Sequence, residues 1–193
     1  SANKQKAQVG LMNTYYNIDD YANTIANAEQ LLKTDNLDAN TKDRAYYITA
    51  NSYMEQGNME MGEKYFALLA NSSSRYSSEA QYNLALLKYS QNALADSEKI
   101  IRQMSKNGAD DYYLAKAFIL WADIFKQKGN DFQAKQTLQS IIDNYEGDQT
   151  IINEAQEKLD ILNNKQIKEK ASNEEKLQEQ ENSVDEVIIE DNK

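Results

Sequence analysis

The sequence predicts an all-α protein built from helical hairpins, and three observations lead to that class. Apolar residues recur at steps of three and four along most of the chain, which is the spacing of one helical stripe. The 193 residues include no Pro and only six Gly, so few positions would interrupt a helix. A pattern of small and large residues also returns at nearly constant intervals, as in proteins made of repeated hairpins.

The clearest hairpin runs from Leu114 to Tyr145. Two apolar stripes lie in it, and Gly129 with Asn130 separates them. We expect Asp131 to cap the second helix by accepting from its free backbone N–H groups. The stripes consist of Ala115, Phe118, Ile119, Trp121, Ala122 and Phe125, followed by Ala134, Leu138, Ile141 and Ile142.

The same pattern occurs three more times upstream. A small residue is expected where the two helices of each hairpin cross, and this position holds Met12, Ala50, Ala85 and Ala122, at intervals of 38, 35 and 37 residues. An aromatic residue follows, at Tyr15, Tyr53, Tyr89 (one place late) and Phe125. The second helix has a small position of its own, at Thr24, Gly62, Ser97 and Ala134. Apolar residues come after it, at Ala28 and Leu31, Phe66 and Leu69, Ile101 and Met104, and Leu138 and Ile141.

This pattern resembles the tetratricopeptide repeat (TPR), whose period is roughly 34 residues. The resemblance implies a right-handed α-α superhelix, a TPR-like solenoid of about four helical hairpins plus a capping helix. The chain departs from the family in three ways. Met12 is large for a small position, Asn92 replaces a turn Gly, and the Pro that often closes a repeat is absent.

The expected elements can be placed in order. Helices are expected at 4–16 and 20–33, 44–56 and 59–70, 78–91 and 93–106, and then within the Leu114–Tyr145 hairpin. The expected N-terminal caps are Asp19 or Asp20, Ser77 or Ser78, and Asp110 or Asp111. The loop over 34–43 should be the longest connection, and Asn107 with Gly108 should end a helix. A capping helix over 149–167 is predicted from the spacing of Ile152, Ala155, Leu159 and Leu162.

These elements give a helical repeat domain over 1–167 and a charged C-terminal extension over 168–193. The extension ends in an apolar cluster, Val184, Val187, Ile188 and Ile189, among acidic residues. We expect this cluster to dock on its own or a neighbouring chain, where it would form a homo-oligomer through the tail. The alternative is that it begins the next element of a longer protein.

Composition excludes several classes of function. A net charge of −10 disfavours nucleic acid and anionic membranes as partners. Without Cys or His, the chain cannot form disulfides or use a His base, and we expect no metal site. No apolar run approaches the roughly 20 residues of a membrane span, so no membrane insertion is expected. The first ten residues lack the apolar core of a signal peptide.

In the family that the chain resembles, the first helix of each hairpin lines a concave surface. Carrying those positions over gives ten candidate partner-binding residues: Tyr16, Tyr47, Asn51, Met54, Tyr82, Asn83, Leu86, Tyr89, Asp123 and Lys126. Tyr and Asn side chains suit an extended peptide. The expected function is therefore a non-catalytic protein–protein interaction scaffold that binds a partner peptide or protein without a cofactor. The carboxylate clamp of one family subtype is not expected, because Val9 and Glu79 stand where cations are needed.

Two other functions stay open. One is a structural or oligomeric assembly module. The other is an accessory protein of bacterial cell-envelope assembly or glycan uptake, which the Asn- and Tyr-rich composition favours together with an envelope location over a cytoplasmic one. Trp121 and four tyrosines are expected to pack between helices, the tyrosines being Tyr15, Tyr46, Tyr53 and Tyr65.

Overall fold

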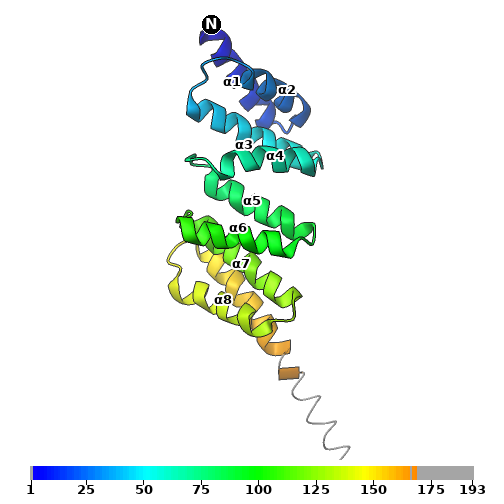
Figure 1. Ribbon diagram of the computed structural model, residues 1–193, viewed down its shortest axis with the longest axis vertical. Helices are drawn as coiled ribbons and strands as arrows, with labels where there is room; N and C mark the ends of the chain where they lie inside the picture. Colours follow the sequence, from blue (N-terminus) through cyan, green and yellow to red (C-terminus); the bar gives the residue numbers. More distant parts are fainter. Residues whose placement is uncertain (1, 166, 169–193) are drawn as a thin grey trace, which may run out of the picture.

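A computed structural model describes residues 2–165, 167 and 168 of the chain. In this part 81% of the residues are helical and none forms a strand, so the predicted all-α class is confirmed. The helices succeed one another along the long axis of the molecule (Figure 1). Their bounds are α1 Ala2–Asn17, α2 Tyr21–Leu32, α3 Ala39–Glu55, α4 Met59–Ala70, α5 Ser77–Ser90, α6 Leu94–Asn107, α7 Asp111–Gln127 and α8 Asp131–Asn144. A further helix over 149–165, the terminal helix, follows α8.

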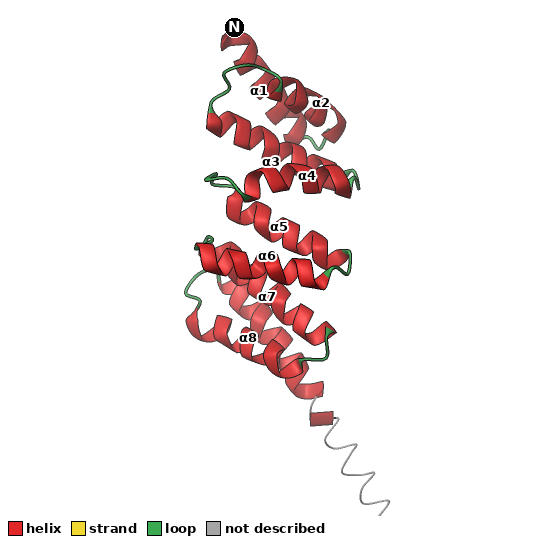
Figure 2. Cartoon of the chain, in the orientation of Figure 1, coloured by secondary structure: helices red, strands yellow, loops and turns green. Residues whose placement is uncertain are grey.

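Each helix packs against the next one along the chain, from α1 on α2 to α7 on α8. Turns within the pairs α1–α2, α3–α4, α5–α6 and α7–α8 lie along one edge, and the connections between pairs lie along the opposite edge (Figure 2). The two helices of a pair therefore run in opposite directions, as expected for hairpins.

The four turns within pairs share one backbone geometry. Each has a residue in the left-handed region, with φ of 58° at Asp19, 75° at Gly57, 59° at Asn92 and 76° at Gly129. The next residue donates its N–H to the carbonyl five residues back, as Asp20 does to Tyr15 at 2.9 Å. Because these turns have the same 38, 35 and 37 intervals as the small positions, one hairpin geometry recurs four times.

The positions predicted to be small are buried in every hairpin. Met12, Ala50, Ala85, Thr24, Ser97 and Ala134 are 0% exposed and Ala122 is 2% exposed, and Gly62 is buried as well. The apolar residues that follow, including Phe66 and Leu138, are also buried. The core therefore runs along the helix crossings from one pair to the next.

In the third hairpin, the turn places Lys88 rather than Tyr89 in the aromatic position. Ala93 donates to the Lys88 carbonyl at 2.9 Å, as the residue after each other turn does to an aromatic residue. The Lys88 ammonium lies 2.6 Å from Glu63 of α4. Tyr89 therefore follows the aromatic position by one residue, as the spacing in the sequence indicated.

Three of the helix caps are aspartates. The side chains of Asp20, Asp38 and Asp110 each accept from a backbone N–H in the first turn of α2, α3 and α7. The Asp38 cap starts α3 at Ala39, so the expected start at Arg44 and the long loop over 34–43 were wrong.

Two expected caps are not formed. Asn130 stands at the N-cap position of α8 without a side-chain bond, and Asp131 instead contacts Lys165 of the terminal helix at 3.1 Å. Neither serine caps α5, because both bond to other elements. Ser77 donates to the Ala70 carbonyl at 3.1 Å, and Ser78 accepts from the Asp110 N–H at 2.9 Å. Gly108 ends α6 at φ 71°, as expected.

The terminal helix buries Ile151, Ala155, Leu159 and Leu162, whereas the predicted Ile152 is only half-buried. The buried stripe of this helix therefore begins at Ile151, one residue before the predicted start, and agrees with the prediction from Ala155 onward. Trp121 is half-buried and its ring stacks on Phe125 with centroids 5.5 Å apart. The four tyrosines expected to pack between helices are half-buried too. The apolar cluster from Val184 to Ile189 lies outside the described residues.

Candidate functional site

The first helices of the pairs, α1, α3, α5 and α7, carry the ten candidate partner-binding residues. We call the surface that they form with the terminal helix the first-helix face. The structure brings part of the predicted set together on this face, in a hollow between α5, α7 and the terminal helix. It places the rest in other surroundings.

The hollow has a volume of about 180 Å³. Four of its lining residues were predicted: Tyr82, Leu86, Tyr89 and Asp123. The three from α5 are spaced by four and three residues, so they share one stripe of that helix. Leu86 is 41% exposed. Leu86 therefore presents an apolar side chain to solvent beside two tyrosines.

Four further lining residues were missed: Lys116, Ile119, Leu120 and Glu154. Ile119 and Leu120 are each 4% exposed and form an apolar floor. The Lys116 ammonium lies 4.6 Å from the centre of the Tyr82 ring and 5.5 Å from that of Tyr112, within the range of a cation–π contact. The step of four between Tyr112 and Lys116 was a readable signal in the sequence, whereas the approach of Tyr82 depends on how α5 packs against α7.

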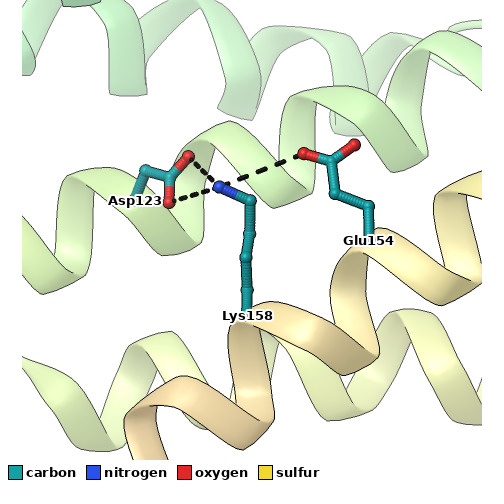
Figure 3. Close-up of polar contacts among 3 residues, drawn as sticks. All are labelled: Asp123, Glu154 and Lys158. Atoms are coloured by element: carbon teal, nitrogen blue, oxygen red, sulfur yellow. Dashed lines mark hydrogen bonds and ion pairs between the residues drawn. The ribbon is translucent and has the colours of Figure 1, made fainter.

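One edge of the hollow is held by an ion pair between α7 and the terminal helix. Lys158 donates to both carboxylate oxygens of Asp123 at 2.9 Å, and its ammonium lies 3.9 Å from Glu154 (Figure 3). Both partners of the closer pair are about one-third exposed, at 31% for Lys158 and 29% for Asp123. The carboxylate of Asp123 is therefore already bonded within the chain.

Lys126 lies beside a second, smaller hollow of about 110 Å³, which also touches Asp123, Lys158 and Ile161. Ile161 is 52% exposed. Because Asp123 lines both hollows, the two are adjacent along the first-helix face.

Toward the N-terminus, Tyr47 joins α3 to α5. Its hydroxyl donates to Glu79 at 2.8 Å, and its ring stacks on Tyr76 with centroids 4.5 Å apart. Burial, followed by this hydrogen bond, raises the pKa of Tyr47, so the hydroxyl stays protonated and acts as a donor near neutral pH. Burial and Glu79 raise the pKa of Tyr113 in the same way.

The carboxylates on this face also act on Tyr16 and Tyr82. Burial raises the pKa of Tyr16, and Glu55, Glu79 and Asp19 raise it further. Burial raises the pKa of Tyr82, with smaller contributions from Glu154 and Asp123. These hydroxyls therefore remain neutral hydrogen-bonding groups in a negative local potential.

Two of the predicted residues have contacts within their own hairpin. Met54 is half-buried and packs against the core cluster of α3 and α4, where its sulfur lies near Gly62. Asn51 is half-buried and donates to the Tyr47 carbonyl of its own helix at 2.9 Å. Asn83 is half-buried on α5.

The arrangement offers apolar contact, aromatic rings and hydrogen-bonding groups. Within the part of the chain that the structure describes, no three acidic residues are grouped so that they could hold a metal ion. The helices in this part also include none with the length and apolar character needed to cross a membrane.

No known protein family matches the chain, and no curated protein matches it either.

Proposed function

We propose that the chain is a TPR-like helical repeat domain that binds an extended segment of another protein on its first-helix face, without catalysing a reaction. The recurring turn, the buried small positions and the pairing of successive helices support a solenoid of this kind. In such a solenoid the hairpins stack into a right-handed superhelix, and the first helices line its concave side.

The observation that carries the binding role is the hollow between α5, α7 and the terminal helix. Its apolar floor is buried, Leu86 is exposed beside it, and Tyr82 and Tyr89 offer rings with polar tips. A well-packed apolar anchor surrounded by polar contacts is the usual form of an interaction hot spot. The Tyr82 hydroxyl, whose pKa is raised by burial, supplies a donor for a carbonyl group of an extended segment.

A catalytic role lacks chemical support at this face. The carboxylate of Asp123 is bonded to Lys158, and the tyrosines with raised pKa values are poor bases near neutral pH. The groups present fit recognition better than proton transfer.

A library of random 12-residue peptides displayed on phage tests this function. We expect the full-length chain to enrich peptides that bind the Leu86→Trp variant at least roughly ten-fold more weakly, because the larger side chain fills the hollow. Leu68→Trp is the matched control, since Leu68 is similarly exposed, at 48%, on α4. If every enriched peptide binds the Leu86→Trp variant as well as the wild type, there is no partner site in this hollow.

A further inference from the structure

A larger hollow lies at the opposite side of α7, and the first-helix face does not include it. Its volume is about 510 Å³, and it opens between the start of α7 and the end of α8, next to the connection over 145–148. No residue lines both this hollow and the two on the first-helix face. We call it the edge hollow.

The edge hollow has an apolar floor and an acidic rim. Leu114, Phe118 and Ile141 contribute the apolar surface, and Ile141 is only 3% exposed. Asp111 and Glu146 line it as exposed carboxylates. Its described lining includes no Lys or Arg, so both of the charged side chains that line it are acidic.

The connections after α4 and α6 each place a residue against the core. Tyr76 packs against the cluster that includes Ala70 and Ala80, and Ala109 packs against the cluster that includes Met104 and Ala117. After α8, Gly147 lies directly against the Tyr145 ring, and the Tyr145 hydroxyl accepts from the Asp148 N–H at 3.1 Å. Tyr145 packs against the core of the α7–α8 pair, and the rest of this connection, Glu146 to Asp148, adds no apolar side chain over the hollow.

We propose that the edge hollow is a second docking site, for a segment of another protein in which a large apolar side chain is flanked by Lys or Arg. The apolar residue would cover Phe118 and Ile141, and the flanking cations would approach Asp111 and Glu146. The net charge of −10 attracts such a basic segment from a distance.

Two other occupants fit less well. The apolar cluster of this chain's own C-terminus is flanked by Asp185, Glu186 and Glu190, which the rim would repel. A typical small-molecule site buries most of the ligand surface. The edge hollow is shallower, because three of its lining residues, Ser140, Asn144 and Glu146, are exposed to solvent.

Three variants of the full chain test the site with the same kind of random 12-residue peptide library. Ser140→Trp fills the hollow from an exposed position on α8. Asp111→Asn with Glu146→Gln removes the rim charges. Glu60→Gln with Asp96→Asn removes as many charges from the first turns of α4 and α6, and it controls for net charge and for the loss of a helix-start carboxylate.

We expect one group of the peptides enriched on the wild type to combine a large apolar residue with Lys or Arg and to lose binding to the Ser140→Trp variant. The rim variant should bind them roughly ten-fold more weakly at low salt, and the charge control should bind them as the wild type does. Thermal melts of the rim variant and the charge control should match each other, because each loses exposed acidic residues that include a helix-start carboxylate.

The site is overturned if no peptide depends on Ser140, or if the peptides that do are neutral or acidic. If every enriched peptide binds the Ser140→Trp variant and some lose binding to the Leu86→Trp variant, the edge hollow is overturned while the first-helix face is supported. Peptides that lose binding only with Ser140→Trp support the edge hollow and place no partner on the first-helix face.

Discussion

Tyr47 of α3 and Glu79 of α5 are joined by a hydrogen bond of 2.8 Å, which links the second hairpin to the third. Tyr47 also stacks on Tyr76, the residue before α5. Tyr47 therefore contacts both α5 and the residue that precedes it.

Replacing Tyr47 should therefore change stability. We expect Tyr47→Phe to lower the free energy of unfolding by about 1 kcal/mol through the lost hydrogen bond. Tyr47→Ala should lower it by about 2 kcal/mol or more, because the ring stack is lost as well. Urea unfolding measures both. Equal stability of Tyr47→Ala and the wild type would mean that Tyr47 contributes nothing to the junction between α3 and α5.

The buried small positions should not tolerate larger side chains. Ala122 and Ala134 are 2% and 0% exposed where α7 crosses α8. Ala122→Leu and Ala134→Leu should each lower the free energy of unfolding by about 1–3 kcal/mol through overpacking. Ala67→Leu is the control, because Ala67 is exposed on α4 and should change stability little. If all three variants melt alike, the two alanines do not lie at close crossings.

Two glycines in different backbone conformations should respond to Ala in opposite directions. Gly129 has φ 76° in the turn after α7, so Gly129→Ala should lower the free energy of unfolding by about 1–2 kcal/mol. Gly10 lies within α1 with no neighbouring atom near its missing Cβ, so Gly10→Ala should raise it by about 0.5–1 kcal/mol. Paired urea titrations compare them, and stabilisation by both changes would be inconsistent with the left-handed turn.

The hairpins could be predicted from the sequence because their signals are local. The signals used were the small residues, the spacing of the apolar stripes and the turn Gly, and each depends on residues within one hairpin. The recurrence of Ala50, Ala85 and Ala122 then gave the spacing between successive hairpins. Asn92 could be recognised as a turn residue because Asn adopts positive φ more readily than most residues.

The errors came from contacts between hairpins. Ser77 and Ser78 are good caps by residue type, but they bond to Ala70 and Asp110 of neighbouring elements instead. At the candidate site, Leu86 and Tyr89 could be placed from helical spacing, whereas Glu154 could not, because its approach depends on where the terminal helix packs. The edge hollow could not be predicted either, since it depends on a connection that fails to fill the space.

The ion pair between Asp123 and Lys158 should contribute modestly to stability. Each partner is about one-third exposed, so a double-mutant cycle with Asp123→Asn and Lys158→Met should give a coupling of about 0.5–1 kcal/mol. The Asp131 and Lys165 pair is a useful comparison, because its 3.1 Å contact is more exposed, at 33% and 51%, and should couple less. Coupling of both pairs should fall in high salt. A larger coupling for the more exposed pair would contradict this order.

Two tyrosines should make stability depend on alkaline pH. Tyr53 and Tyr65 donate to the same oxygen of Glu29 at 2.8 and 3.2 Å, and burial together with this carboxylate raises the pKa of each from about 10 to about 12. Between pH 10 and 12 the unfolded chain loses these protons while the folded chain keeps them, so the free energy of unfolding falls as pH rises. Below pH 10 both hydroxyls are protonated in the folded and the unfolded chain, so they should not make the free energy of unfolding depend on pH.

A double variant with Tyr53→Phe and Tyr65→Phe tests this pH dependence. It should be less stable than the wild type by about 1–2 kcal/mol at pH 8, because two hydrogen bonds are lost, but it should lose less stability as pH rises above 10. Urea unfolding at several pH values, with tyrosinate absorbance followed in the folded state, measures both parts. If the stability of variant and wild type falls equally with pH, the pKa of neither hydroxyl is raised in the folded chain. The hydrogen bonds to Glu29 would then not form in solution.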